Sequence, residues 1–251
     1  MTAPRYRPSL LRTALVGLDL LVVTTALSML TILSAPFGSR IPHFCARTWA
    51  RLWLACAGVR VRCTGLERLD RSRCYVFVCN HQSALDIPLL FTTLPFRICF
   101  IAKKELLLVP FLGWGTAALG CVYIDRGNAR RAHASMTAAT DKLRRGRGSL
   151  VIFPEGTRSE DGIVQAFKTG SFHLAIQTGV ALVPVAIHDS RMVLPKHSFL
   201  VGPGPVLLEI GAPIAVDGLV RANKAALAER VQAIVAGMVG ERNELPSAQP
   251  Q

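Results

Sequence analysis

The sequence has few acidic and few aromatic residues for its length. Its 251 residues include 16 Asp and Glu against 29 Lys and Arg, a net charge of +13, and only 7% are aromatic. No basic helix or zinc-finger spacing accompanies this charge, so nucleic acid is not an expected partner. A basic chain that is 51% hydrophobic instead favours an anionic membrane surface or a phosphate-bearing substrate.

The sequence also lacks cysteine and nucleophile patterns that would define other classes of protein. The seven cysteines are scattered, their number is odd and no CxxC pair occurs. We therefore expect reduced thiols in a cytosolic compartment, with neither a disulfide framework nor a metal cluster. A GxSxG nucleophile elbow is missing too, which argues against a serine esterase of that type.

A long apolar run occupies residues 13–35. It is long enough to cross about 30 Å of hydrocarbon as a helix. Arginines lie on both sides, so they give no clear orientation, and Asp19 lies inside the run. A signal peptide is the alternative, but the run is long for one and no clear A-x-A site follows. We expect an uncleaved anchor.

A second segment, residues 47–59, places two tryptophans beside two arginines. This composition suits a helix at a membrane interface, and a helix packed on the domain core is the alternative. With the first run it could form a hairpin that dips into one leaflet. We therefore divide the chain into a membrane anchor with interfacial helices (1–60) and a catalytic domain (61–251).

From residue 60 onward, apolar runs alternate with helical patterns. Residues 129–146 have helical periodicity and end at a glycine, and a helical stripe from 227 to 238 follows Asn223 as a possible cap. This alternation predicts an α/β fold, a mixed sheet flanked by helices and preceded by an N-terminal membrane-embedded helical hairpin. The expected strands are 59–65, 74–79, 97–102, 121–124, 149–153, 180–187 and 205–211.

Polar clusters begin where four of these strands end. They are Asn80-His81, Lys103-Lys104-Glu105, Asp125-Arg126 and the segment 154–158. Ligands of open α/β sheets bind beyond the carboxyl ends of the strands. One such cluster is ordinary turn polarity, but four that together carry a histidine, carboxylates and cations indicate a single site.

His81 and Asp86 allow a structural and a catalytic interpretation. On one regular helix a five-residue gap separates side chains by roughly 140°, so a contact requires a strand-to-helix turn between them. Ser83-x-x-Asp86 also resembles a helix capping box, or Asp86 could itself cap. If the two side chains meet, the carboxylate fixes the tautomer of the imidazole and leaves the other nitrogen free to accept a proton.

The segment FPEGTRS (153–159) also has two interpretations. Pro-Glu-Gly is good turn material. Alternatively, the loop could receive an anion through its backbone N–H groups and Arg158, and Glu155 could bind a substrate hydroxyl.

Four motifs in order resemble those of the glycerolipid acyltransferases, in particular the lysophosphatidic acid acyltransferase group. NHQSALD (80–86) matches the NHxxxxD signature, and FPEGTRS (153–159) matches the third motif closely. GCVYIDR (120–126) is similar to the second motif, and VPVAI (183–187) to the fourth. The resemblance covers most of the chain after residue 60.

The resemblance implies roles for particular residues. His81 would be the general base and Asp86 its partner. The acceptor's glycerol phosphate would be held by Glu155, Gly156, Thr157 and Arg158, with Arg126 assisting, and Pro184 would shape the wall of the site. No metal or other cofactor is implied beyond the acyl-CoA or acyl carrier protein that serves as co-substrate.

The implied reaction transfers an acyl group to 1-acyl-sn-glycerol-3-phosphate and yields phosphatidic acid for phospholipid biosynthesis. The expected partners are membrane lipids, the lysophospholipid acceptor and the acyl donor. The expected place is the inner membrane, with the catalytic domain on the cytoplasmic face. Another lysolipid acceptor, such as a lyso-ornithine lipid, or a non-catalytic lipid-binding role remains open.

The segment PFLGWG (110–115) lies beside the expected site. Its Phe111, Leu112 and Trp114 would either contact lipid, line an acyl channel or pack in the core.

Overall fold

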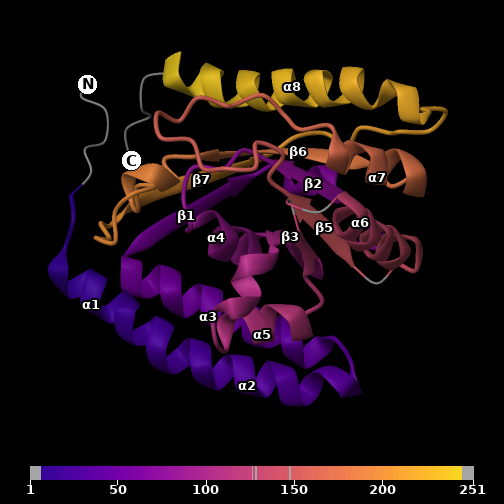
Figure 1. Ribbon diagram of the computed structural model, residues 1–251. Coiled ribbons are helices and arrows are strands. Elements are labelled where there is room, and N and C mark those ends of the chain that lie inside the picture. The colour runs from indigo at the N-terminus through magenta and orange to yellow at the C-terminus, as the bar shows by residue number, and fades with distance from the viewer. Residues whose placement is uncertain (1–6, 126, 128, 147, 245–251) are drawn as a thin grey trace.

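The protein is built on one mixed seven-stranded sheet (Figure 1). The computed structural model describes residues 7–125, 127, 129–146 and 148–244. All seven expected strands form, and they are ordered β1-β7-β6-β2-β5-β3-β4. Their bounds are β1 Val59–Thr64, β2 Val76–Cys79, β3 Ile98–Lys103, β4 Val122–Ile124, β5 Ser149–Ile152, β6 Leu182–His188 and β7 Gly204–Ile210.

Strand direction divides the sheet into two parts. The five adjacent strands β6, β2, β5, β3 and β4 run parallel to one another. β7 is antiparallel to β6, and β1 pairs with β7 in parallel. The carboxyl ends of β2 and β5, which are direct neighbours, therefore meet at one edge of the sheet, where the polar clusters were expected to gather.

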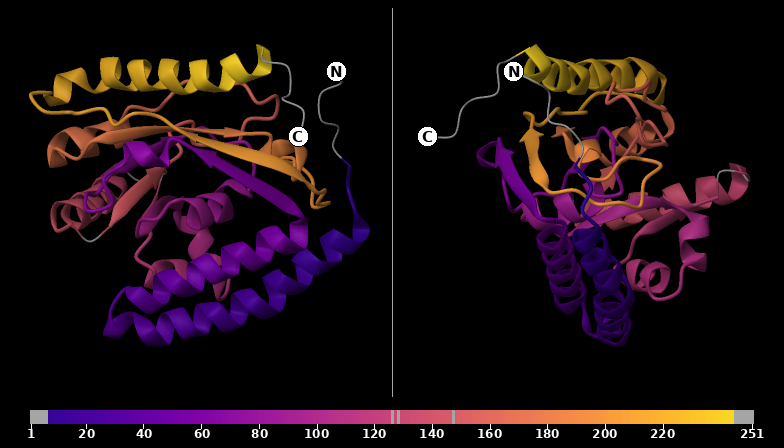
Figure 2. Two further views of the ribbon diagram at one scale, coloured as in Figure 1. Left: turned by 180° about the vertical axis from the view of Figure 1, so that it is seen from behind. Right: turned by 90° about the vertical axis from the view of Figure 1, so that its left-hand side faces the viewer.

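Helices cover both faces of the sheet (Figures 1 and 2). The N-terminal helices, α4 and α5 lie on one side, and α6, α7 and α8 lie on the other. Each side has its own buried apolar cluster, as expected for a sheet with two covered faces. The bounds are α4 Asp86–Thr93, α5 Leu112–Ala118, α6 Ala129–Arg144, α7 Gly170–Thr178 and α8 Lys224–Glu244, with 3-10 turns η3 Leu66–Arg68, η4 Lys104–Leu108, η5 Ser190–Met192 and η6 Arg221–Asn223.

The two helices expected from periodicity form as α6 and α8. The apolar stripe of α8 packs on the sheet, and Leu227, Val231 and Val235 are buried. Asn223 directly precedes α8, but its side chain accepts the backbone N–H of Val220 at 2.8 Å. Asn223 therefore closes the preceding turn instead of capping α8 through its side chain.

The N-terminal apolar run forms one continuous helix. It comprises α1 Leu10–Leu18, the π-helical turn η1 Asp19–Val23, α2 Thr24–Ser34 and the 3-10 turn η2 Ala35–Phe37. These 28 residues are long and apolar enough to cross a membrane. The chain then reverses, and α3, Arg40–Ala57, returns alongside as the second arm of a helical hairpin.

The second arm packs on the domain core, which was the alternative to an interfacial helix. Trp53 and Leu54 are buried in the cluster beneath the sheet. Arg47 donates hydrogen bonds to the carbonyls of Leu94 and Phe96, both at 3.0 Å, and so ties α3 to the end of α4. Trp53 and Arg47 of this segment therefore stabilise the domain.

The polarity of α2 is reversed relative to a helix of a water-soluble protein. Its buried residues are Thr24, Ser28, Thr31 and Ser34, all of them polar. Its outward face exposes Met29, Leu30, Ile32 and Leu33 at 36–68%. A helix in water buries its apolar stripe, whereas a helix in lipid faces apolar side chains outward and turns small hydroxyl residues toward its neighbours.

Candidate active site

β2 carries the histidine to the edge of the sheet, and Asn80 fixes its end. The Asn80 side chain donates to the carbonyl of Ile187 at 3.0 Å and accepts the Ile187 N–H at 2.7 Å. These two hydrogen bonds hold the residue that follows β2 against the carboxyl end of β6. His81 therefore leaves the strand at a defined point.

His81 and Asp86 contact each other directly. The Nδ1 of His81 lies 2.7 Å from the Oδ2 of Asp86. Asp86 is completely buried, whereas the side chain of His81 is 18% exposed. A proton on Nδ1 donated to the carboxylate leaves Nε2 as the basic nitrogen, and the exposed part of the ring gives a substrate access to it.

A turn between β2 and α4 closes the five-residue gap, as expected. Asp86 is the first residue of α4, and its Oδ2 also accepts the N–H groups of Gln82 at 2.8 Å and Ser83 at 3.0 Å. Ser83 does not start the helix. Its hydroxyl donates to the carbonyl of Leu194 at 2.7 Å and accepts the Leu85 N–H. The carboxylate thus orders the turn that holds its own histidine.

The loop after β5 forms the second wall around the imidazole. The ring of Phe153 stacks on His81 with a centroid distance of 4.1 Å and an interplanar angle of 20°. Phe153 also stacks with Phe100, at a centroid distance of 6.1 Å. The N–H of Ser159 donates to the carbonyl of His81 at 2.7 Å, so a backbone hydrogen bond also holds this loop against His81.

Glu155 has a different environment from the one expected of a substrate ligand. It is 4% exposed, and its Oε1 accepts the backbone N–H of His81 at 2.8 Å. Its Oε2 accepts the N–H of Gln165 at 3.0 Å. Burial raises the pKa of this carboxyl group above its ordinary value. Both oxygens are thus engaged by the backbone, which favours a bracing role for Glu155 over direct contact with the acceptor.

The remaining residues of this motif diverge in position. Gly156 has a φ of 75°, a left-handed conformation that suits glycine, and closes a turn onto the carbonyl of Phe153. Thr157 is exposed, whereas Arg158 is half-buried and lines a cavity. Arg126, the expected second cation, lies outside the described residues.

Two other expected positions are taken up by structural contacts. Lys104 forms an ion pair with Asp125 at 2.8 Å, which joins the ends of β3 and β4. Pro184 lies inside β6 opposite Val78 of β2, is buried, and is absent from the lining of the cavity. Pro184 therefore shapes the sheet beneath the site, which corrects the expectation that it forms the wall.

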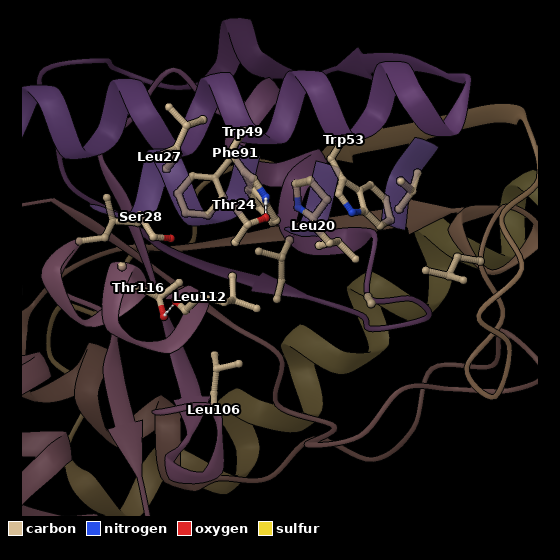
Figure 3. A pocket seen from close by; sticks show the side chains of 18 of the residues that line it. Leu20, Thr24, Leu27, Ser28, Trp49, Trp53, Phe91, Leu106, Leu112 and Thr116 are labelled. Carbon is tan, nitrogen blue, oxygen red and sulfur yellow. Dashed lines mark hydrogen bonds between the residues drawn. The ribbon is translucent and has the colours of Figure 1, made fainter. Parts of the chain in front are cut away.

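An apolar cavity of about 690 Å³ lies between the N-terminal hairpin and the rest of the domain (Figure 3). Ala84 and Ile87, which flank Asp86, form part of its wall together with Arg158. Leu20, Leu27, Trp49, Phe91 and Leu112 point into it (Figure 3). Within the segment 110–115, Leu112 and Gly115 line the cavity, whereas Trp114 is 51% exposed.

Several residues at this site were not predicted from the sequence. Phe153 was read only as part of a motif, and a stacking contact has no signal in a single sequence. Lys196 and His197 lie at the rim of the cavity, where both pair with the Oε1 of Glu160. No local pattern connects residues 196–197 with the site, because only the tertiary fold brings this loop to the cavity.

Comparison with known proteins gives the family. The acyltransferase family model matches residues 60–188, just over half of the chain. The chain belongs to the acyltransferase family. The matched range contains His81, Asp86 and Phe153, whose ring stacks on the histidine. The match begins at β1 and ends at the last residue of β6.

Individual relatives support this membership. The chain is 33% identical over 190 residues to a 1-acyl-sn-glycerol-3-phosphate acyltransferase of Saccharomyces cerevisiae, covering 74% of this chain and 62% of that protein. It is 34% identical over 175 residues to the human 1-acyl-sn-glycerol-3-phosphate acyltransferase alpha, covering 70% of this chain and 62% of that protein. The chain therefore spans about three fifths of the length of these relatives.

A solved structure shares nearly the whole architecture. The 1-acyl-sn-glycerophosphate (LPA) acyltransferase PlsC from Thermotoga maritima superposes with a TM-score of 0.82 at 28% identity. The likeness covers 95% of this chain and 98% of that structure. The N-terminal helices as well as the acyltransferase domain are therefore part of the shared fold.

Proposed function

We propose that the protein transfers an acyl group from a thioester donor to the free hydroxyl of 1-acyl-sn-glycerol-3-phosphate and so makes phosphatidic acid. The observation that carries this proposal is the contact of His81 with Asp86 at the edge of an apolar cavity. The names of the relatives support the acceptor, and acyl-CoA or acyl carrier protein would supply the donor.

The residues suit this chemistry. A thioester is already activated, so an alcohol can attack it without a covalent enzyme intermediate. The Nε2 of His81 takes the hydroxyl proton as the new C–O bond forms, and the C–S bond then breaks. The imidazolium returns this proton to the departing thiolate. Asp86 holds the ring and stabilises its transient positive charge.

Arg158 suits the phosphate of the acceptor. Arg158 lines the cavity, and its guanidinium makes no hydrogen bond or ion pair within the described part of the chain. A guanidinium can bind a phosphate through two parallel hydrogen bonds. The apolar remainder of the cavity would accommodate an acyl chain, for which hydrocarbon is the favourable environment.

The site of action is a membrane. The reversed polarity of α2 and the 28-residue apolar helix support insertion of the hairpin, through the outward face that carries Leu30 and Leu33. We assign the protein to the inner membrane with its catalytic domain on the cytoplasmic side, where thioester donors are found. Thr157 and Gly156 would border the phosphate, and no metal or further cofactor enters the scheme.

An acceptor series tests the proposal. Labelled acyl-CoA is offered with 1-acyl-sn-glycerol-3-phosphate, with lysophosphatidylcholine and with a lyso-ornithine lipid. We expect transfer to the first and a rise in its KM for Arg158→Ala of roughly 10-fold or more, as for a lost charged hydrogen bond. Arg221→Ala, on the α8 side of the sheet, is the matched control. Equal transfer to all three lipids would contradict a phosphate-specific acceptor site.

A further inference from the structure

The loop between η5 and β7 exposes an aromatic side chain that nothing in the fold covers. Phe199 is 93% exposed, the highest value among the large apolar side chains in the described part of the chain, and Leu200 is 38% exposed. A single exposed apolar residue is ordinary on a protein surface. The position of this one relative to the N-terminal helix makes it informative.

Hydrogen bonds fasten the loop to the beginning of α1. The N–H of Ser9 donates to the carbonyl of Val201 at 2.9 Å, and the N–H of Val201 donates to the Oγ1 of Thr13 at 2.9 Å. The orange segment before β7 accordingly lies beside the first turn of α1 (Figures 1 and 2). In that turn Leu10 and Leu11 are 78% and 71% exposed.

The apolar surface of the hairpin therefore continues onto a loop of the catalytic domain. The outward side of the helix made of α1, η1 and α2 exposes Leu15, Leu18, Leu21 and Leu33 at 41–71%, a face too apolar for water. A lipid bilayer covers a continuous surface of this length. A protein partner would have to match the helix and the loop together.

Polar groups next to Phe199 suit the depth of the lipid headgroups. Lys196 and His197 are held at the surface by the carboxylate of Glu160, at 2.9 and 3.0 Å. An aromatic ring next to such groups is typical of the boundary between acyl chains and headgroups. The same residues, Lys196 to Phe199, form part of the rim of the 690 Å³ cavity.

We propose that residues 196–200 form a second membrane-contact element, in which Phe199 and Leu200 enter the leaflet that holds α1. The contact would place the rim of the cavity against the lipid, so that a lysolipid acceptor can pass from the bilayer to the site without crossing water. The proposal rests on the membrane association stated under the proposed function, and it concerns binding alone.

Depth-dependent fluorescence quenching tests the contact. Tryptophan is introduced as Phe199→Trp, and the full-length protein is reconstituted into vesicles of phosphatidylcholine and phosphatidylglycerol with or without bromine on the acyl chains. The emission of the three native tryptophans is removed by subtracting the parent protein measured under the same conditions. We expect the added emission to shift to the blue and to be lost in brominated vesicles.

Two matched variants make the result decisive. Val220→Trp carries the reporter at a 61% exposed position just before α8, on the opposite side of the sheet, and should show no loss. Leu11→Trp on α1 should be quenched. If Leu11→Trp is quenched and Phe199→Trp is not, the hairpin alone contacts lipid and the proposal is wrong. If neither variant is quenched, both the membrane insertion of the hairpin and this proposal are wrong. Because no turnover is measured, loss of the proposed reaction would leave this result unaffected.

Discussion

Replacing Glu155 with glutamine separates the bracing role of this residue from the acceptor-binding role suggested by its sequence. Its two oxygens accept the N–H groups of His81 and Gln165 at 2.8 and 3.0 Å. Glutamine has one oxygen, so one buried N–H would face an amide NH2. An unsatisfied buried donor destabilises a protein by about 1–3 kcal/mol. At roughly 2–4 °C per kcal/mol for a chain of this size, the melting temperature should fall visibly.

The assay combines thermal unfolding in detergent with steady-state kinetics. Glu155→Gln should unfold at a lower temperature and lose kcat, because the backbone N–H that loses its partner belongs to His81, the proposed general base. Glu229→Gln, at an exposed position of α8, is the control and should leave both quantities unchanged. A variant with unchanged stability and a raised KM for the acceptor would refute the bracing role.

The ionisation of the same carboxyl group adds a pH dependence with a defined sign. Burial raises the pKa of Glu155 above its ordinary value of 4.5. The folded protein therefore holds this proton more tightly than the unfolded chain, and the contribution of the group to the free energy of unfolding falls as pH rises from 4.5 through the folded pKa. The free energy of unfolding of wild type, minus that of Glu155→Gln, should therefore fall as pH rises over that range. A rise in this quantity with pH would contradict the assignment.

Three further substitutions test other parts of the structure. Phe153→Leu removes the ring stacked on the imidazole and should lower kcat by up to about 100-fold with little change in KM, measured as initial rates. Gly115→Ala would place a Cβ 2.6 Å from the Oγ of Ser28 and should destabilise the packing of α5 on α2 by about 1–3 kcal/mol, whereas Gly170→Ala, with open space around it, should not. Ala46→Trp would fill part of the cavity and should shift preference toward shorter acyl thioesters, measured with donors of different chain length.

The sequence predicted the sheet because its strands are short apolar runs separated by turn residues. β2, β5 and β6 are buried along their whole length, which is why they read as continuous apolar segments rather than alternating ones. The hairpin was predicted from the length of an apolar run. Its reversed polarity was not, since only the packing of α2 against α3 and α5 shows that Ser28 and Thr31 face inward.

The site was predicted in part. The contact of His81 with Asp86 followed from the motif and from the turn that such a gap requires. The environment of Glu155 did not, because the histidine N–H that it accepts lies 74 positions away in the chain. A carboxylate in a turn looks the same in sequence whether it faces a substrate or the backbone. The rim residues Lys196 and Phe199 were missed for a similar reason, since they reach the cavity only through the fold.

The proposed acyl transfer to a lysophosphatidic acid depends on His81, held by Asp86, as its general base. The decisive experiment measures transfer from labelled acyl-CoA to 1-acyl-sn-glycerol-3-phosphate by wild type and His81→Ala, both shown to be folded by circular dichroism. The loss of a general base should lower kcat by about 100-fold to 10,000-fold. Transfer by the folded variant at the wild-type rate would contradict the account.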